Sequence, residues 1–167
     1  ARIEGFDLMA SLSEAPIIVI EGDEYLASPI DRQAKFLLYQ PHICLISGIA
    51  WDHINVYPTF DSYTDSFKQL IQELPKAGCL FIDETDHLLV GLAENCPEHA
   101  DKQGYQAHPS TISNGQTILK GEDGNDYPIQ VFGEHTLKNL NGARLICEQI
   151  GISSTAFYEA IQSFKGA

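Results

Sequence analysis

The sequence has few basic residues. Lysine and arginine together number 10, against 23 aspartates and glutamates, so the formal net charge is -13 at pH 7. Such a chain repels polyanions, because binding to nucleic acid depends on basic side chains that displace counterions from the phosphates. We therefore expect no nucleic acid and no anionic membrane surface among its partners.

Paired cysteine motifs and long apolar runs are also missing. The four cysteines show no C-x-x-C spacing, and Cys44 and Cys79 lie inside apolar runs, where a thiol acts as a small hydrophobic side chain. No run approaches the roughly 18 apolar residues of a membrane span, and residues 1–4 lack the pattern of a signal peptide. We expect a cytoplasmic protein with reduced cysteines, and its 167 residues suit one domain.

The first half of the chain alternates between two kinds of segment. Residues 17–20, 43–47 and 79–82 are short apolar runs rich in β-branched side chains, which is typical of buried parallel strands. Residues 61–74 place their apolar side chains on one helical face, and residues 31–39 predict a shorter helix before Pro41. This alternation predicts a doubly wound sheet.

The second half, after Glu94, is richer in glycine, aspartate, asparagine and proline. Residues 116–120 and 128–132 flank a turn and predict an antiparallel hairpin. Two helices are expected at the end, one over 137–150 that stops at Gly151, and one that begins after Ser153 or Ser154. The predicted class is α/β: a mostly parallel, doubly wound sheet with flanking helices and a small antiparallel hairpin.

Two polar side chains follow predicted strands. Glu21 comes directly after the first run, and His53 follows the second. Ligands of parallel sheets bind outside the carboxyl ends of the strands, and Mg²⁺ prefers carboxylate oxygens together with substrate phosphates. The alternatives are that the acidic side chains at positions 21, 23 and 24 are solvated or cap a helix, and that Asp52-His53 only anchors a loop.

The combination of motifs is more specific than any one of them. Glu-Gly-Asp-Glu-Tyr at 21–25, Trp-Asp-His at 51–53, Tyr-Pro-Thr-Phe at 57–60 and Phe-Gly-Glu-His-Thr-Leu-Lys-Asn at 132–139 occur in this order. Together they resemble the central, ATP-binding domain of the Mur ligases of peptidoglycan synthesis. The resemblance covers about residues 17–166.

The resemblance implies a role for four residues. Glu21 matches a glutamate that binds magnesium between the ATP phosphates and an acyl phosphate, and His53 matches a histidine that holds a second magnesium ion. Asn139, in the pattern His-x-x-x-Asn, matches an asparagine that reads adenine, and an amide can both donate to and accept from a purine edge. His135 is either a second nucleotide contact or a packing residue at the helix start.

Several positions depart from the family pattern. Gly48, Ala50 and Thr136 stand where the family often has Asn, Glu and Asn, and Lys68 is expected to be a solvated helix lysine. The Gly-x-x-Gly-Lys-Thr phosphate loop is missing from residues 1–167. We therefore expect residues 1–167 to be a truncated central domain, without the N-terminal UDP-sugar domain and the C-terminal domain, and inactive by themselves.

The insertion at 31–36 and the Tyr-Gln-Pro at 39–41 are most similar to one branch of the family. Its members use ATP and Mg²⁺ to join UDP-N-acetylmuramate to L-alanyl-γ-D-glutamyl-meso-diaminopimelate in peptidoglycan recycling. Three alternatives stay open: the branch that adds L-alanine to the same first substrate, a non-catalytic domain that keeps the fold as a scaffold, and a generic α/β domain without a nucleotide site.

Overall fold

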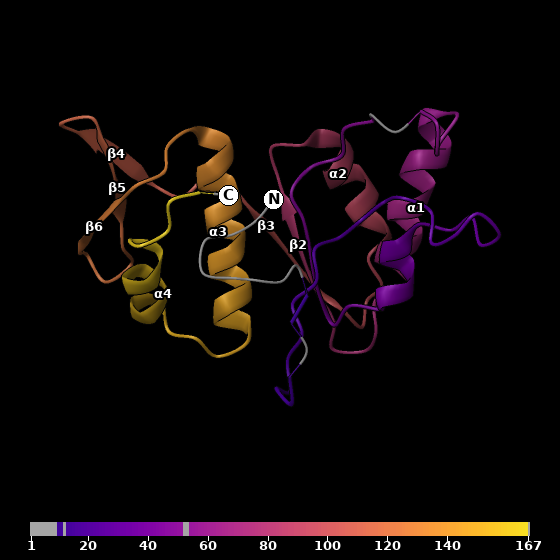
Figure 1. The fold of residues 1–167 in the computed structure, drawn as a ribbon, viewed down its shortest axis with the longest axis horizontal. Coiled ribbons are helices and arrows are strands. Elements are labelled where there is room, and N and C mark those ends of the chain that lie inside the picture. The colour runs from indigo at the N-terminus through magenta and orange to yellow at the C-terminus, as the bar shows by residue number, and fades with distance from the viewer. Residues whose placement is uncertain (1–9, 12, 52–53, 167) are drawn as a thin grey trace.

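The computed structural model describes residues 10–11, 13–51 and 54–166. Figure 1 shows four layers across the molecule: the antiparallel sheet β4–β6, the helices α3 and α4, the parallel sheet β1–β3, and the helices α1 and α2. The parallel sheet thus has helices on both faces, as the sequence predicts for a doubly wound α/β fold. Within the described residues, no helix is long and apolar enough to cross a membrane.

The parallel sheet consists of β1 (Ile43–Ile46), β2 (Cys79–Asp83) and β3 (Asp101–Tyr105), in the order β1-β2-β3. Its central strand β2 is buried along its whole length, which explains its continuous apolar sequence. Strand β3 was not predicted, because four of its five residues are exposed and polar or glycine at the sheet edge. All three strands run in the same direction, so their carboxyl ends lie at one edge.

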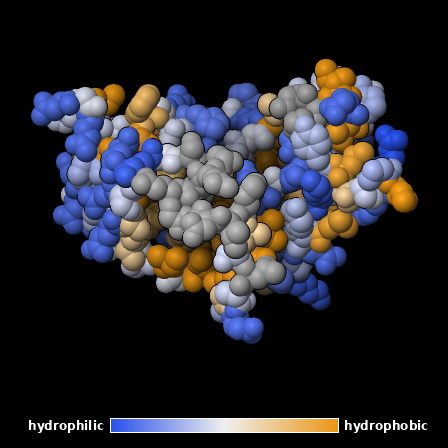
Figure 2. Space-filling view, in the orientation of Figure 1, coloured by the Kyte–Doolittle hydropathy of each residue, from blue (hydrophilic) through white to orange (hydrophobic). Residues whose placement is uncertain are grey.

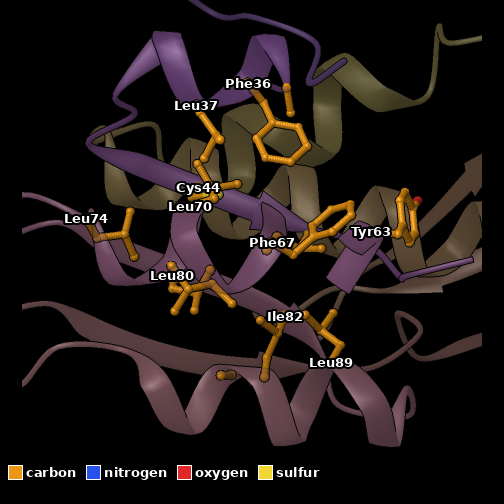
Figure 3. Packing of buried hydrophobic residues seen from close by; sticks show 14 of the residues in the cluster. Phe36, Leu37, Cys44, Tyr63, Phe67, Leu70, Leu74, Leu80, Ile82 and Leu89 are labelled. Carbon is orange, nitrogen blue, oxygen red and sulfur yellow. The ribbon is translucent and has the colours of Figure 1, made fainter. Parts of the chain in front are cut away.

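One face of this sheet is covered by α1 (Phe60–Gln72), α2 (His87–Leu92) and the short 3₁₀ helices η1 (Lys35–Tyr39) and η2 (Ala93–Asn95). Helix α1 begins at a capping box in which the Thr59 side chain accepts from the Ser62 backbone and the Ser62 side chain accepts from the Thr59 backbone. Its buried side chains pack with those of β1, β2, η1 and α2 into the main core (Figure 3): Tyr63, Phe67, Leu70 and Ile71.

The other face is covered by α3 (Glu134–Gln149), whose Leu145 packs with Cys79, Phe81 and Tyr105. The helix approaches the sheet closely at Gly142. A β-carbon at this position would lie 3.1 Å from Cζ and 3.2 Å from Oη of Tyr105, and closer still to Leu45. Burial raises the pKa of Tyr105 to about 12, and its hydroxyl has no hydrogen-bond partner in the described part of the chain.

A second, antiparallel sheet contains β4 (Ser110–Ser113), β5 (Gln116–Lys120) and β6 (Asp126–Ile129), in the order β4-β5-β6. The predicted hairpin of β5 and β6 is confirmed, and β4 extends it by one strand. Its core joins side chains of α3 to those of α4 (Ser154–Ile161), which begins at the Ser153 cap as expected. In Figure 2 this end of the molecule, at the left, is largely hydrophilic on the visible face.

A buried histidine ties this second core together. His108 Nδ1 lies 2.9 Å from the carbonyl oxygen of Pro109, and Nε2 lies 2.8 Å from the Tyr158 hydroxyl. A carbonyl can only accept, so Nδ1 carries the proton and Nε2 accepts from Tyr158. Burial lowers the pKa of His108, and the nearby Arg144 lowers it further, against the opposing effects of the Pro109 carbonyl and Glu122.

The strand predicted over residues 17–20 is wrong. These residues form no strand, and Ile17, Ile18, Val19 and Ile20 are 46% to 86% exposed. An apolar run indicates a tendency to be buried, but a parallel strand also needs a neighbour for its backbone groups, and no described segment supplies one here.

The predicted helix over 31–39 is shorter than expected, because residues 26 and 34 form a β-bridge before η1 begins.

The four cysteines are free thiols, as expected from their spacing. Cys44 and Cys79 lie in the cores on the two faces of the parallel sheet, and burial raises the pKa of the Cys44 thiol to about 12. These two side chains therefore act as small hydrophobic groups.

We predict that Gly142→Ala lowers the free energy of unfolding by about 1 kcal/mol. The added methyl group must displace the end of the Leu45 side chain and crowds the Tyr105 ring, and overpacking of this kind costs about 1–3 kcal/mol, which exceeds the gain of up to about 1 kcal/mol in helix propensity. Urea unfolding measures the change. Gly91→Ala in α2 is the matched control, because its β-carbon would meet no atom within 4 Å. This variant should be more stable than wild type, and an equal gain from Gly142→Ala would contradict the packing argument.

We also predict that the protein loses stability on mild acidification through His108. Its folded pKa lies below the unfolded value of about 6.5, so the stabilisation is present above that value and is lost as the pH falls through the folded pKa. Unfolding free energies measured between about pH 7.5 and about pH 5 should therefore fall less steeply in His108→Asn than in wild type. The exposed His42 is the control, since His42→Asn should keep the wild-type pH dependence.

Candidate functional site

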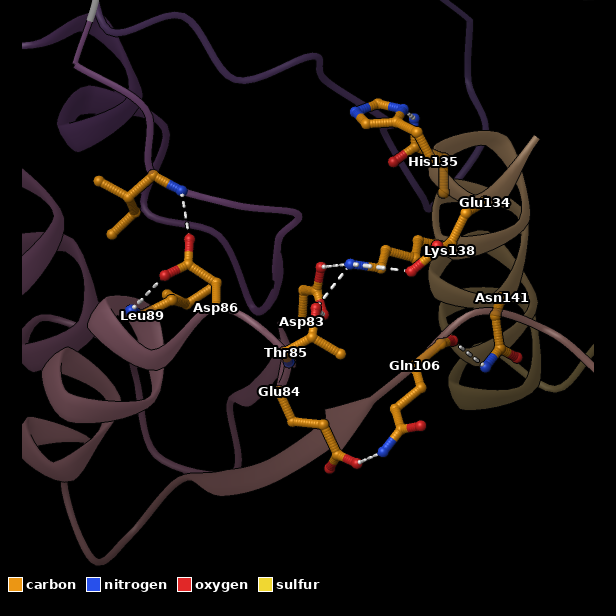
Figure 4. Close-up of polar contacts among 12 residues, drawn as sticks. Asp83, Glu84, Thr85, Asp86, Leu89, Gln106, Glu134, His135, Lys138 and Asn141 are labelled. Atoms are coloured by element: carbon orange, nitrogen blue, oxygen red, sulfur yellow. Dashed lines mark hydrogen bonds and ion pairs between the residues drawn. The ribbon is translucent and has the colours of Figure 1, made fainter.

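Polar side chains gather at the carboxyl edge of the parallel sheet (Figure 4). Asp83 ends β2, Thr85 and Asp86 follow it, and the first turns of α3 lie beside them with Glu134 and Lys138. This edge is where open parallel sheets bind their ligands.

Two hydrogen bonds hold the loop after β1, one to the start of α2 and one to the segment before α1. The backbone N–H of Ile49 donates to Asp86 Oδ2 at 2.9 Å, and the other carboxylate oxygen of Asp86 caps α2 by accepting from the N–H groups of Leu88 and Leu89. Further along, Trp51 Nε1 donates to the carbonyl oxygen of Tyr57 at 3.1 Å. Asp86 is thus both a helix cap and an anchor for the loop.

His53, the predicted second magnesium ligand, lies outside the described residues, as does Asp52. The structure therefore describes the chain on either side of this position but does not test its role. His53 stays a prediction.

Glu21 is exposed in an irregular segment, so it does not follow a strand as the sequence predicted. It lines a shallow hollow of about 340 Å³ with Gly22, Asp23, Glu24, Tyr25 and Tyr39. Asp23 is engaged elsewhere: its Oδ2 lies 2.8 Å from Lys35 Nζ, and its Oδ1 accepts from the backbone of Tyr25. Glu21 therefore presents its carboxylate to solvent, and its role as a metal ligand stays a prediction.

The first turns of α3 carry the two residues predicted for the nucleotide. The helix begins after Gly133, which adopts a positive φ of 93°. His135 and Asn139 are both exposed and lie one turn apart, and the Asn139 amide nitrogen is 3.4 Å from His135 Nδ1. The structure thus brings these two side chains together on one accessible surface.

An ion pair between a partly buried lysine and a buried aspartate at the same edge was missed by sequence reasoning. Lys138 Nζ lies 2.9 Å from Asp83 Oδ2 and donates to the Thr85 hydroxyl at 2.6 Å. Burial alone would raise the pKa of Asp83, but hydrogen bonds from Thr85 and Lys138 outweigh it and hold the pKa below its ordinary value. The bond to Asp83 raises the pKa of Lys138. An acidic residue ending an otherwise apolar strand was the available sequence signal.

The described residues contain no group of three His, Cys, Asp or Glu side chains placed to hold a metal ion. The arrangement offers instead an exposed carboxylate at Glu21 and an exposed amide at Asn139. A single carboxylate suits Mg²⁺, which keeps several waters and takes further oxygens from substrate phosphates. The roles of Glu21 toward magnesium and of Asn139 toward a nucleotide stay predictions.

Comparison with known proteins places this site in context. The E. coli (strain K12) UDP-N-acetylmuramate–L-alanyl-γ-D-glutamyl-meso-2,6-diaminoheptandioate ligase is 25% identical over 169 residues, which cover 97% of this chain and 37% of that protein. The UDP-N-acetylmuramate–L-alanine ligase of Desulfitobacterium hafniense (strain Y51) is 24% identical over 157 residues, with 87% and 34% covered. The chain thus spans little more than a third of the curated relatives it matches.

Solved structures show the same fold. The Neisseria meningitides enzyme with the L-alanyl-γ-D-glutamyl-meso-diaminopimelate specificity superimposes with a TM-score of 0.75 at 19% identity, over 93% of this chain and 50% of that one. The Thermotoga maritima MurF ligase, solved in complex with ADP, superimposes with a TM-score of 0.57 at 12% identity, over 76% and 31%.

The Mur ligase middle domain matches residues 6–147, which is most of the chain. The predicted fold class agrees with this match. The chain belongs to the Mur ligase family and carries its middle domain.

Proposed function

We propose that residues 1–167 are part of the central domain of a cytoplasmic, ATP-dependent amide-bond ligase. The full-length enzyme joins UDP-N-acetylmuramate to L-alanyl-γ-D-glutamyl-meso-diaminopimelate in peptidoglycan recycling. The observation that carries the proposal is the match to the Mur ligase middle domain over residues 6–147. The substrate pair is supported by the E. coli relative, whose name states it, and by the structural likeness to the N. meningitides enzyme.

Asn139 and His135 bind the nucleotide in this proposal. Both are exposed on the first turns of α3, at the sheet edge where parallel folds bind ligands. The Asn139 amide has a donor and an acceptor, which match the N6 amino group and a ring nitrogen of adenine. The ADP bound to the T. maritima MurF supports a nucleotide as the ligand of this domain type.

Glu21 and His53 hold magnesium ions in this proposal. Glu21 is exposed and can give a carboxylate oxygen, whereas the neighbouring Asp23 is already paired with Lys35. Magnesium, when bound, would stabilise the negative charge that develops on the transferred phosphoryl group.

The reaction that fits these parts proceeds in two steps. ATP phosphorylates the lactyl carboxylate of UDP-N-acetylmuramate, and the amino group of the incoming peptide then attacks the acyl phosphate, so that an amide bond forms and phosphate leaves. No side chain forms a covalent bond to substrate. The residues of this domain bind and orient the reactants, which is catalysis by positioning and electrostatic stabilisation.

L-Alanine is the second candidate acceptor. The D. hafniense L-alanine ligase is 24% identical to this chain, nearly the same value as the E. coli tripeptide ligase. A non-catalytic scaffold is the third candidate, and the departures at Gly48, Ala50 and Thr136 favour it.

We predict that the full-length protein, given ATP, magnesium and UDP-N-acetylmuramate with both acceptors in competition, forms mainly the tripeptide product. Glu21→Gln should lower turnover by about 100-fold or more, because a charged ligand is lost from the magnesium ion that would stabilise the transferred phosphoryl group. Product formation is measured by chromatography with mass detection.

Glu14→Gln is the matched control, because Glu14 is an exposed glutamate in the same N-terminal segment and should be replaceable without loss of turnover. If the main product contains L-alanine, the acceptor is L-alanine and not the tripeptide. If Glu21→Gln has the turnover of wild type, Glu21 does not belong to the site. A full-length protein that makes no ATP-dependent product with either acceptor would leave the scaffold as the function.

A further inference from the structure

Helix α3 contacts the parallel sheet through one narrow stripe of its surface. Lys138 bonds to Asp83 at the end of β2, the Asn141 side chain donates to the carbonyl oxygen of Gln106 at 2.8 Å, and Gly142 packs against Tyr105. Residues spaced by three and four lie on the same helical face. These contacts therefore fix how the helix is rotated about its own axis.

Lys138 is the polar contact of this stripe nearest to the candidate site. Its side chain is 19% exposed and that of Asp83 is 6% exposed. Its ammonium group is already occupied by the Asp83 carboxylate and the Thr85 hydroxyl, and the Glu134 carboxylate lies 3.9 Å away. Removing the lysine would leave the buried Asp83 carboxylate without a compensating charge. Lys138 is thus committed to the fold rather than free to bind a phosphate.

The nucleotide residues lie directly beside this stripe. Each helical position advances by about 100°. Asn139 therefore lies about 100° from Lys138, and His135, three positions earlier, lies about 60° from it on the same side. Both are exposed (Figure 4 shows His135 and Lys138 on adjacent turns). The direction in which these two side chains point depends on the rotation that the Lys138 contact sets.

We infer that the Asp83–Lys138 pair is a positioning pair for the purine base of the nucleotide. It holds the first turns of α3 against β2, so that the Asn139 amide faces the adenine edge, and it does this without touching the nucleotide. This inference rests on the proposed ATP-dependent function. It extends that function by assigning the preference for adenine over guanine to the contact between Asp83 and Lys138, which lies beside the nucleotide residues.

The test uses the full-length enzyme with Lys138→Met, Asp83→Asn and the double variant. We expect the KM for ATP to rise about tenfold and the preference for ATP over GTP, as a ratio of kcat/KM, to fall about tenfold. The kcat and the KM for UDP-N-acetylmuramate should change less than about threefold. The double variant should resemble the single variants, because all three lose the same contact.

Lys120→Met is the matched control, because it removes a lysine from an exposed ion pair with Asp126, 2.7 Å long, in the antiparallel sheet. It should leave the KM for ATP and the base preference unchanged. The double variant also serves where a single variant does not fold, since it buries no uncompensated charge.

Three results would overturn the inference. The first is a wild-type KM for ATP and base preference in the folded variants. The second is a fall in kcat together with a rise in the KM for ATP and in the KM for UDP-N-acetylmuramate, while the base preference stays unchanged. Failure of all three variants to fold counts with it, because either result would make the pair a requirement of the fold alone. A wild-type enzyme that forms no ATP-dependent product refutes the proposed function, and the inference with it.

Discussion

The packing of α3 against the parallel sheet is the contact on which the rest of the structure depends. One side of the helix packs Leu145 against Phe81 and Tyr105, and the opposite side packs Leu140 into the core of the antiparallel sheet. In the described residues the two sheets share no strand pairing. The helix is therefore the element that joins the two cores, and the close approach at Gly142 decides how deeply it sits.

This helix also gives the candidate site its position. Its first turns carry His135 and Asn139 at the carboxyl edge of the sheet, and Lys138 attaches these turns to the end of β2. The residues that attach the helix and the residues of the candidate site thus lie on adjacent faces of the same turns. A change in the packing of the helix would shift His135 and Asn139, which lie within one turn of Lys138, so the packing of the helix and the geometry of the candidate site are linked.

The sequence predicted the elements whose burial follows a simple period. The apolar run of β2, the helical stripe of α1 and the hairpin of β5 and β6 are confirmed. The edge strand β3 was missed because its exposed residues carry no apolar signal, and residues 17–20 were wrongly predicted because an apolar run does not specify its partner. His135 and Asn139 followed from a local motif. The contact between Lys138 and Thr85 spans 53 positions, and no local pattern encodes it.

The order of α3 after all three strands of the parallel sheet has a consequence for biosynthesis. The ribosome completes β1, β2 and β3 well before α3 emerges, so one face of the finished sheet has no cover for the time needed to translate the intervening residues. Phe81 and Tyr105 lie on that face and stay uncovered until α3 is made. The nascent chain therefore exposes an apolar surface of the type that chaperones bind until α3 docks on the sheet, and the second core is complete only once α4 has followed.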